Sequence, residues 1–519
     1  MYKPESILLR DLITASGLNP FTLVGTHHQM VTDLSLQGNK CIEGSLFIAI
    51  VGTHRDGHEY AAQAVANGAK TLLVQRRVEA PESVTQLIVP DTRKALGLLA
   101  HVFFGCPSEK LTIGAVTGTN GKTSTAWTLA SIFRAAGLQA GLIGTLGAQL
   151  GHGDILRDTN NTTPDALALH RLLAEMYQAG VRAVAMEASS HGIDQERLAG
   201  IRIDCAALTN ITQDHLDYHK TFENYKNAKK RLFFDCLKLG SHPVAVFNVD
   251  DPSGAEFSQE YVGDQLRFSC MDGTAAEVRC TNIRHQPAHT SFDLHIGAKS
   301  ASVVLPLVGE FTVANSAAAA SMAHAIGVPL PYIVQGIQQV LPVPGRFESV
   351  DAGQDFRVVV DYAHTPDALE KTLRTARRLC TGKVICVFGC GGDRDATKRP
   401  IMGRVVDHYA DQMIITSDNP RNEDPQAIAR DIRAGISRRS ALEILDRALA
   451  IERAIFHAKP GDTVVICGKG HETTQELDNG IKIAFDDRAV ARTILEELLK
   501  HKAGKPEINS LLSAGKDAS

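Results

Sequence analysis

The stretch Leu111-Thr-Ile-Gly-Ala-Val-Thr-Gly-Thr-Asn-Gly-Lys-Thr-Ser124 decides the fold in the middle of this chain. An apolar run typical of a buried strand ends in a glycine-rich turn, and a helix-compatible segment, residues 126–136, follows. Such a turn directs backbone N–H groups and a helix N-terminus at an anion. Lys122 adds a full positive charge, and the Thr123 hydroxyl can bind Mg²⁺. The sequence therefore predicts an ATP-binding cradle made by Gly118, Thr119, Asn120, Gly121, Lys122, Thr123 and Ser124.

The glycine spacing departs from the strict P-loop pattern, which has a glycine at the position of Val116. A glycine-rich turn with a solvated lysine is therefore the alternative to a phosphate cradle. This stretch does not show which reaction the phosphate would serve. That has to be inferred from other parts of the chain.

The composition is that of an ordinary globular protein. The chain has 519 residues, 44% of them hydrophobic and 22% charged, and a formal net charge of −4. This length predicts several domains, and the charge offers no basic surface for nucleic acid. No apolar run approaches the roughly 18 residues that span a bilayer, and the start lacks the pattern of a secretory signal. We therefore expect neither a nucleic-acid nor a membrane partner.

The ten cysteines include no Cys-x-x-Cys pair. Cys386 and Cys390 flank an expected strand end, and we expect them to be buried free thiols rather than metal ligands. This usage indicates a reducing compartment, the cytoplasm.

The chain is predicted to be an α/β protein with three blocks, 1–108, 109–345 and 346–500, and a flexible tail at 501–519. Apolar runs of strand length recur in all three blocks, at 45–51, 71–74, 181–187, 205–208, 243–248, 357–361, 383–388, 412–416 and 462–467. Their alternation with helix-compatible segments predicts a mostly parallel sheet around the cradle. The segment 341–346, with two prolines and a glycine, is expected to be a linker. In such sheets, ligands bind beyond the carboxyl ends of the strands.

Three polar residues of the middle block are candidates for metal chemistry. Glu187 ends an expected strand and could bind Mg²⁺, but could also be a salt-bridged surface carboxylate. His215 could bind a metal or only stabilise its loop. Lys229 lies in a basic helical segment, 225–233, where composition alone favours a solvated charge.

These motifs resemble the Mur ligase family in order and spacing. The residues that carry the resemblance are Gly118-Thr-Asn-Gly-Lys-Thr123, Glu187-Ala-Ser-Ser-His-Gly192, Thr209-Asn-x3-Asp-His-Leu-Asp-Tyr-His219 and Tyr225-x-x-Ala-Lys229. The resemblance implies a three-domain architecture with a central P-loop ATPase-like parallel sheet and a Rossmann-like C-terminal domain. It implies that ATP activates a carboxylate, which then joins an amine. It also implies that Lys229 carries a CO₂-derived carbamate, which together with Thr123, Glu187 and His215 binds Mg²⁺. Lys122, Lys229, His215 and Glu187 are then the catalytic set.

Further matches place more residues around the nucleotide. Asn315 matches the segment that holds adenine, although Thr312 stands where the family usually has asparagine. Arg346 matches the linker arginine that reaches the nucleotide phosphates, and Asp361 begins a matching Asp-Tyr-Ala-His-Thr-Pro motif.

The carboxyl-terminal block is expected to select the amine through three polar loops, at 389–395, 417–425 and 467–472. The Asp-Asn-Pro-Arg motif resembles that of family members that add meso-diaminopimelate as the third peptide residue. The residues implied in its binding are Arg394, Asp418, Asn419, Pro420, Arg421, Gly468 and Glu472. Arginine forks pair with the second carboxylate of diaminopimelate and would repel the terminal ammonium of lysine. A lysine-adding ligase is the nearest alternative, followed by a folylpolyglutamate-type ligase and a non-catalytic nucleotide-binding relative.

The carboxylate substrate implied by the resemblance is UDP-N-acetylmuramoyl-L-Ala-D-Glu, an intermediate of peptidoglycan synthesis and thus of cell-wall biogenesis, cell shape and cell division. The residues implied in its binding are Leu36, Thr53, His54, Arg55, Asn161, Thr162, Thr163, Ser189, Gln195 and Arg197. Gln37-Gly-Asn39 stands where the family usually has Asp-Ser-Arg, so Gly38 offers no hydroxyl to the uridine. We expect the protein to act as a monomer.

Overall fold

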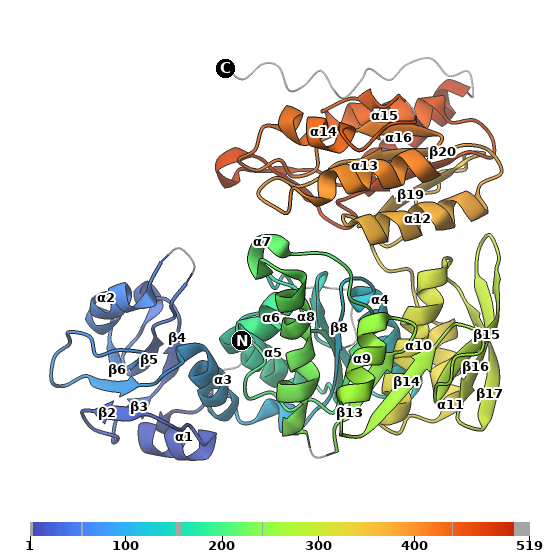
Figure 1. Ribbon diagram of the computed structural model, residues 1–519. Coiled ribbons are helices and arrows are strands. Elements are labelled where there is room, and N and C mark those ends of the chain that lie inside the picture. Colours follow the sequence, from blue (N-terminus) through green and yellow to red (C-terminus); the bar gives the residue numbers. More distant parts are fainter. Residues whose placement is uncertain (1–3, 53–54, 152–156, 241, 439, 503–519) are drawn as a thin grey trace.

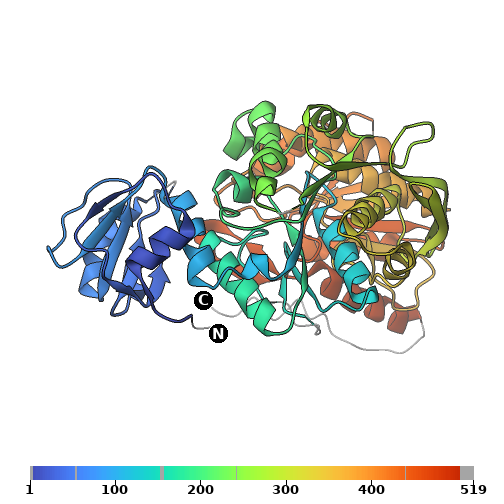
Figure 2. The same cartoon turned by 90° about the horizontal axis from the view of Figure 1, so that it is seen from below.

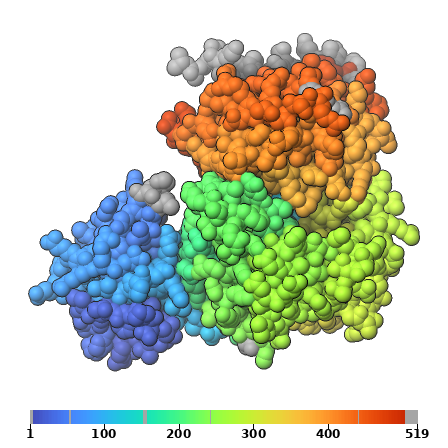
Figure 3. Space-filling model, viewed as in Figure 1, coloured from blue at the N-terminus to red at the C-terminus, as the bar shows by residue number. Residues whose placement is uncertain are grey.

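The computed structural model describes residues 4–52, 55–151, 157–240, 242–438 and 440–502. The expected α/β class is confirmed, because three units, each built on its own main sheet with helices packed on it, follow one another along the chain. Figure 1 shows the N-terminal unit beside the middle unit, and the C-terminal unit above the middle unit. The view from below in Figure 2 and the space-filling view in Figure 3 show the same arrangement, with the N-terminal unit to one side. Among the described residues, no helix has both the length and the apolar character needed to cross a bilayer.

The middle sheet places the cradle between two other strand ends. Its central strand β8 (Thr112–Thr117) pairs in parallel with β11 (Ala183–Glu187) on one side and β12 (Cys205–Leu208) on the other. The parallel part continues through β9 (Ala140–Gly144) at one edge and β13 (Val244–Asn248), β14 (Gln265–Ser269) and β15 (Val278–His285) toward the other. The loops that follow β8, β11 and β12 therefore open at one edge of the sheet, as expected for a ligand site.

Helices cover both faces of this sheet. On one face lie α4 (Lys122–Ala135), α10 (Glu310–Ala325) and α11 (Leu330–Gln338). Residues of α5 (Ala166–Gln178), α6 (Ser190–Asp194), α8 (Phe222–Arg231) and α9 (Pro252–Glu260) pack in the second core cluster. A short helix, α7 (Leu216–His219), follows β12. Because both faces are covered, β8, β11 and β12 are almost wholly buried and apolar, which is why they were recognisable as short apolar runs.

The expectation of a mostly parallel sheet omitted an antiparallel extension. The strands β15, β16 (Thr290–Ile296) and β17 (Lys299–Leu305) form a meander, and β10 (Gly147–Gln149) pairs antiparallel with β9 at the far edge. In β16 every second residue is buried and the others are half-buried. Only one face of the meander contacts the core, so its strands alternate in polarity and lack a continuous apolar run.

The N-terminal unit is a smaller sheet with strand order β2-β7-β6-β5-β4. Its parallel strands are β4 (Asp33–Ser35), β5 (Ser45–Ile48), β6 (Ala69–Val74) and β7 (Thr85–Ile88), with β2 (Thr22–Val24) antiparallel at the edge. Residues of α1 (Leu9–Ser16) and α3 (Thr92–Phe103) share one core cluster, and those of α2 (Ala61–Ala66) share a second. Contacts between α3 and α5 join this unit to the middle one.

The C-terminal sheet has the order β18-β19-β23-β20-β21-β22. The strands β19 (Arg357–Asp361), β23 (Thr463–Cys467), β20 (Val384–Phe388), β21 (Gln412–Ile415) and β22 (Leu442–Glu443) are parallel, and β18 (Glu348–Ser349) is antiparallel. Residues of α12 (Pro366–Leu379), α13 (Lys398–Tyr409) and α14 (Pro425–Arg433) share one core cluster, and those of α15 (Arg447–His457) and α16 (Asp487–Lys502) share another. A hairpin of β24 (Thr474–Glu476) and β25 (Lys482–Ala484) follows β23. No helix or strand lies between α11 and β18, which confirms the linker at 341–346.

Candidate active site

The cradle loop has the close backbone approaches that require glycine. Gly118 and Gly121 have φ angles of 151° and 91°. A Cβ on Gly118 would lie 1.9 Å from Thr209 Oγ1, and one on Gly121 would lie 2.3 Å from Asn315 Oδ1. The glycines therefore let the loop pack against β12 and α10, although Val116 replaces the strict P-loop glycine. This geometry favours the phosphate cradle over the alternative of a turn with a solvated lysine, because Lys122 is folded over the loop rather than solvated.

Two lysine ammonium groups share one carbonyl oxygen of the cradle. Lys122 Nζ donates to Gly118 O at 2.9 Å and to Thr119 O at 3.0 Å, and Lys229 Nζ donates to Gly118 O at 2.8 Å. Lys229 is 1% exposed, so it is not one of the solvated charges that the composition of its helix suggests. Burial, together with the charge of Lys122, holds the pKa of Lys229 well below its usual range, and burial also lowers the pKa of Lys122.

Glu187 is a buried carboxylate aimed at the cavity rather than a surface group. Its Oε1 accepts the backbone N–H of Thr145 at 2.9 Å and its Oε2 accepts the Thr145 hydroxyl at 3.0 Å. Across the cavity, His215 lies 3.4 Å from Asp214 in the loop after β12. Burial lowers the pKa of His215, so its imidazole is neutral near pH 7 and has a free nitrogen lone pair.

A cavity of about 200 Å³ joins these groups to the C-terminal unit. The predicted residues that line it are Thr119, Asn120, Gly121, Lys122, Thr123, Ser124, Thr162, Glu187, Ser189, His215, Asn315, Arg346 and Asp361. Arg346 donates to the Thr123 hydroxyl at 3.0 Å and lies over the Tyr362 ring. Burial raises the pKa of Asp361, whose carboxylate accepts the N–H groups of Phe347 and Ala363. The structure thus brings the predicted ATP-binding residues together.

Direct contacts join the middle and C-terminal units around this cavity. The Asn120 side chain donates to Asp367 at 2.7 Å, and Lys398 Nζ lies 3.8 Å from Asp214 Oδ1. These residues come from the cradle, from the loop after β12 and from the first turns of α12 and α13. The cavity is therefore shared by the two units and depends on how they are placed relative to each other.

Thr312, which stands where the family usually has asparagine, lies behind the wall of the cavity. The Thr312 hydroxyl donates to Gly309 O at 2.5 Å in the first turn of α10. Phe311 and Asn315 of this helix line the cavity, and Thr312 does not. The residue that differs from the family pattern therefore has no direct access to a nucleotide in this arrangement.

The three polar loops predicted to select an amine meet at the carboxyl edge of the C-terminal sheet. The Asn419 amide donates to Glu472 Oε2 at 2.8 Å. A Cβ on Gly468, whose φ is 119°, would lie 2.3 Å from Asp418 Oδ2, and one on Gly392 would lie 1.9 Å from Pro420 O. The Gly468 N–H donates to Asp361 O at 3.1 Å, so this loop cluster adjoins the ATP cavity.

The arginines predicted to recognise the amine differ in their surroundings. Arg421 has a φ of 50°, and its guanidinium pairs with Glu476 Oε2 at 2.9 Å and donates to Gly392 O at 2.8 Å. Arg394 is exposed and donates to the carbonyl of Asp393. Arg421 is thus held in place by the loop cluster, and Arg394 lies at its margin.

A second cavity, of about 240 Å³, lies between the N-terminal and middle units. Leu36, Gln195 and Arg197 line it together, and Arg197 donates to Gln195 Oε1 and to Thr163 O. Thr163 is buried against Glu187 O and Ser189 Oγ, and so braces the wall between the two cavities.

Other residues predicted to bind the carboxylate substrate, as far as the structure describes them, do not line either cavity. Asn161 is exposed, and Arg55 is exposed and donates to the Tyr60 hydroxyl. Thr53 and His54 lie outside the described residues. A Cβ on Gly38 would lie 2.9 Å from Tyr60 O, so the 3₁₀ turn at Gly38–Lys40 packs against the start of α2 in a way that excludes a serine there.

Sequence reasoning missed several polar residues of these sites. Thr145, Asn210, Asp214, His364 and Lys371 line the ATP cavity, and Lys398 and Lys469 are buried beside the predicted groups. Asn210 and Asp214 lie within the quoted Thr209–His219 cluster, and the cluster signal could have found them. His364 and Lys469 likewise lie within the quoted Asp-Tyr-Ala-His-Thr-Pro motif and the loop 467–472. Thr145, Lys371 and Lys398 reach the sites only through contacts between distant segments.

Comparisons with known proteins fit this geometry. Residues 31–104, 116–323 and 345–470 match, in that order, the Mur ligase family catalytic domain, the Mur ligase middle domain and the Mur ligase glutamate ligase domain. A relative from Bacillus licheniformis, named UDP-N-acetylmuramoyl-L-alanyl-D-glutamate–2,6-diaminopimelate ligase, is 44% identical over 471 residues, which are 90% of this chain and 95% of the relative. This chain belongs to the Mur ligase family. As a Mur ligase it is an ATP-dependent, ADP-forming, amide-bond-forming enzyme.

Two further relatives agree with this assignment. A ligase of the same name from Bacillus cereus is 41% identical over 490 residues, 94% of this chain and 98% of the relative. A solved structure of a ligase of that name is 32% identical, has a TM-score of 0.67 and covers 95% of this chain and 100% of its own. The three-domain Mur ligase architecture expected from the motifs is therefore confirmed.

Proposed function

We propose that this Mur ligase joins meso-diaminopimelate to the D-Glu carboxylate of UDP-N-acetylmuramoyl-L-Ala-D-Glu, a step in peptidoglycan precursor synthesis. The observation that carries the proposal is the continuity of the two sites through Asp361. Its carboxylate borders the ATP cavity, and its carbonyl accepts the N–H of Gly468 in the loop cluster of Asn419, Arg421 and Glu472. An activated carboxylate and an incoming amine can meet there without leaving the protein.

The donor set of the ATP cavity fits Mg²⁺. Mg²⁺ prefers oxygen ligands and keeps several waters and substrate phosphates in its shell, so it needs few protein ligands. The Thr123 hydroxyl and the Glu187 carboxylate supply such oxygens, with neutral His215 as a further ligand. When bound, the ion neutralises charge on the β- and γ-phosphate oxygens of ATP.

The position of Lys229 supports a CO₂-derived carbamate on its Nζ. An unmodified ammonium there is buried, competes with Lys122 for Gly118 O and would repel a metal ion. A neutral amine is the form that adds to CO₂, with loss of one proton, and the product is an anion. Carbamylation therefore replaces repulsion between two cations by attraction between Lys122 and an anionic group.

The reaction follows from the placement of these groups. A carboxylate oxygen of D-Glu attacks the γ-phosphorus, the bond to the β-phosphate oxygen breaks, and ADP leaves with an acyl phosphate in place. The neutral amine of diaminopimelate then attacks the acyl carbon, and phosphate and one proton depart as the amide forms. Lys122 stabilises charge on the transferring phosphoryl group, and Arg346 holds the Thr123 side of the cradle.

The substrate assignments follow the two cavities. We assign Leu36, Asn161, Thr162, Thr163, Ser189, Gln195 and Arg197 to the muramoyl dipeptide, with Thr53, His54 and Arg55 toward its nucleotide sugar. The Asp418–Arg421 and Gly468–Glu472 loops, with Arg394, are assigned to diaminopimelate. We place domain boundaries at residues 108 and 345, and a monomeric enzyme in the cytoplasm, where its ten free thiols stay reduced.

The proposal is tested by incubating the protein with ATP, Mg²⁺, UDP-N-acetylmuramoyl-L-Ala-D-Glu and meso-diaminopimelate. We expect ADP, phosphate and a UDP-muramoyl tripeptide of the corresponding mass, no ADP when the dipeptide substrate is omitted, and no sustained turnover of ATP when the amine is omitted. ATP hydrolysis that is indifferent to both would contradict the proposal and favour a nucleotide-binding relative without ligase chemistry.

A further inference from the structure

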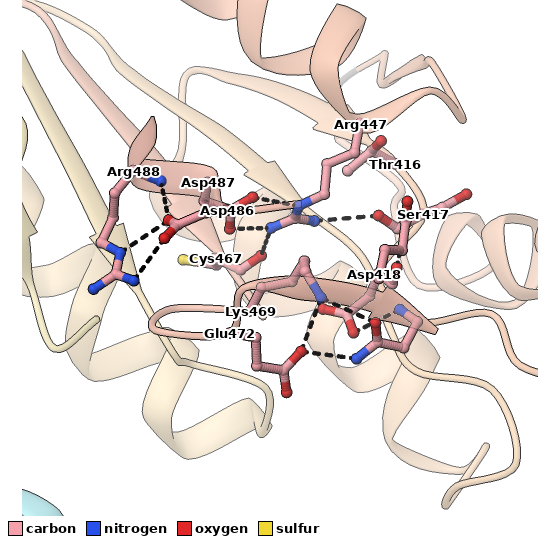
Figure 4. Close-up of polar contacts among 12 residues, drawn as sticks. Thr416, Ser417, Asp418, Arg447, Cys467, Lys469, Glu472, Asp486, Asp487 and Arg488 are labelled. Atoms are coloured by element: carbon pink, nitrogen blue, oxygen red, sulfur yellow. Dashed lines mark hydrogen bonds and ion pairs between the residues drawn. The ribbon is translucent and has the colours of Figure 1, made fainter. Parts of the chain in front are cut away.

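The two loops assigned to the amine leave strands that are not neighbours. The Asp418–Arg421 loop follows β21 and the Gly468–Glu472 loop follows β23, and β20 lies between them in the sheet. Their spacing is therefore not set by a shared strand ladder. The guanidinium of Arg447, the first residue of α15, lies between the starts of the two loops (Figure 4).

The Arg447 guanidinium contacts the backbone immediately before each loop. Its Nη1 donates to Ser417 O at 3.3 Å and its Nη2 donates to Cys467 O at 2.9 Å. Its Nε and Nη2 donate to the two carboxylate oxygens of Asp487, both at 2.7 Å (Figure 4). One planar group thus joins the residue before Asp418, the residue before Gly468 and the first residue of α16.

Burial makes this arrangement both rigid and sensitive to change. The side chains of Arg447 and Asp487 are 0% exposed. Removing either partner leaves a buried charge without its counter-ion, and a lysine cannot reproduce the fork that reaches two carbonyls and a carboxylate together. Neither side chain is open to a substrate, so any effect on the amine acts through the loops.

Lys469 transmits the loop spacing to the side chains. Its fully buried ammonium donates to Asn419 Oδ1 at 2.9 Å, Glu472 Oε2 at 2.8 Å and Thr474 O at 2.7 Å. Because the Asn419 oxygen faces Lys469, its amide N–H₂ faces Glu472 (Figure 4 shows Lys469 beside Glu472). A change in the distance between the loops would break this network.

We propose that Arg447 and Asp487 are positioning residues for the amine substrate. Their ion pair sets the spacing of the Asp418–Arg421 and Gly468–Glu472 loops and, through Lys469, the orientation of Asn419 and Glu472. The inference rests on the proposed function only in naming meso-diaminopimelate as the ligand of these loops.

The test compares Arg447→Lys, Arg447→Met and Asp487→Asn with the wild type. Asp487→Asn keeps the shape of the side chain but replaces one of its two acceptor oxygens by an N–H₂ donor, so it weakens the ion pair without leaving a cavity and serves if Arg447→Met fails to fold. We expect KM for meso-diaminopimelate to rise roughly 10-fold in Arg447→Lys and Asp487→Asn and about 10²-fold in Arg447→Met, because small misplacements of positioning groups have effects of this size. KM for ATP and for the UDP-muramoyl dipeptide should stay within about twofold of wild type, since Arg447 touches neither cavity.

The matched control is Arg377→Met, which removes a guanidinium from the opposite edge of the same sheet. Arg377 pairs with Asp411 before β21 and donates to Gly382 O before β20. We expect this variant to lower the unfolding temperature without changing any KM.

The outcomes separate this inference from the proposed function. If Arg447 and Asp487 variants lose kcat in proportion to their folded fraction and keep the wild-type KM for the amine, their role is structural and the inference is wrong. If the wild type does not use meso-diaminopimelate but uses another amine, the proposed function fails, and the same KM comparison with that amine still decides the inference.

Discussion

The ATP cavity and the amine loop cluster both gather buried cations, but they give those cations different partners. At the cradle that borders this cavity, Lys122 and Lys229 donate to backbone carbonyls, and within the described part of the chain neither has a carboxylate oxygen within 4.0 Å. In the loop cluster, three cations have carboxylate partners: Arg421 pairs with Glu476 at 2.9 Å, Lys469 with Glu472 at 2.8 Å and Arg447 with Asp487 at 2.7 Å.

This difference matches the charges of the two ligands. A triphosphate is a strong anion, and the ammonium of Lys122 in the buried cradle attracts it and stabilises charge that develops on it. Diaminopimelate carries two ammonium and two carboxylate groups, and a cluster with paired charges of both signs can exchange partners with it. The cradle with Lys122 therefore suits the phosphate groups of ATP, and the loop cluster suits a ligand that carries charges of both signs.

The comparison is tested most strongly at Lys229, the buried lysine whose ammonium contacts the carbonyl of Gly118. We expect Lys229→Ala to lower turnover roughly 10³-fold, because the mutation removes the anionic group that a carbamate supplies beside Lys122. Short-chain carboxylic acids should restore part of the activity by entering the vacated space. Steady-state phosphate release measures both effects.

Lys230→Ala is the matched control for this prediction. Lys230 follows Lys229 on α8 but is partly exposed and pairs with Glu260. It should keep near wild-type turnover, and normal turnover in Lys229→Ala without additive would exclude the carbamate.

The next test removes a cation of the loop cluster that is paired with a carboxylate. Arg421→Ala should lower kcat/KM for meso-diaminopimelate about 10²-fold, because the distal carboxylate loses its fork and Glu476 is left unpaired. KM for ATP should be unchanged. Arg430→Ala, which removes an exposed guanidinium from α14, should leave both values as in the wild type. An equal loss for ATP would show that the two regions are not separate.

A buried histidine outside both regions shows how burial changes the pKa of a side chain. His170 in α5 is fully buried, its Nε2–H donates to Ala199 O at 3.0 Å, and burial lowers its pKa to about 3. Below pH 6.5, His170 binds a proton in the unfolded chain but stays neutral in the folded chain. The free energy of unfolding therefore falls as the pH drops from about 6.5 toward 3. At pH 5 this amounts to about 2 kcal/mol.

Thermal unfolding between pH 7.5 and 5 measures this loss, with His170→Gln as the comparison. The variant cannot titrate and should show a smaller fall in unfolding temperature than the wild type. Equal slopes for the two proteins would contradict the assignment to His170.

The smallest effect is expected at Thr312, beside the cavity but not in its wall. Thr312→Asn restores the usual family residue, and we expect KM for ATP to change by less than about threefold because only residues that touch the ligand alter its binding strongly. A change of 10-fold or more, measured by initial rates, would mean that Thr312 faces the nucleotide during turnover.

The sequence predicted those parts of the fold that depend on local pattern. Strands such as β8 and β20 are buried on both faces and therefore appear as continuous apolar runs. The meander β15–β17 has one exposed face and alternates, so a search for apolar runs missed it. Glycines 118 and 121 were recognisable because their backbone geometry excludes other residues.

The residues of the candidate site were predictable only where they lie in a sequence motif. Composition suggests a solvated Lys229, and only the family resemblance implies that it takes part in the chemistry of the site. Arg447 and Lys398 are single basic residues in ordinary surroundings, and their partners Asp487 and Asp214 come from segments far away in the sequence. Lys469 lies in a loop that the sequence singled out, but its contact with Asn419 joins two distant loops. Their roles arise from tertiary contacts, which a local pattern does not encode.

The most direct test of the comparison is a one-tube competition between meso-diaminopimelate and L-lysine for the UDP-muramoyl dipeptide, with both products measured by mass. The paired charges around Arg421 and Glu472 predict almost exclusive formation of the diaminopimelate product, with discrimination of about 10³-fold or more. Comparable amounts of the two products, or an excess of the lysine product, would contradict the account of the loop cluster.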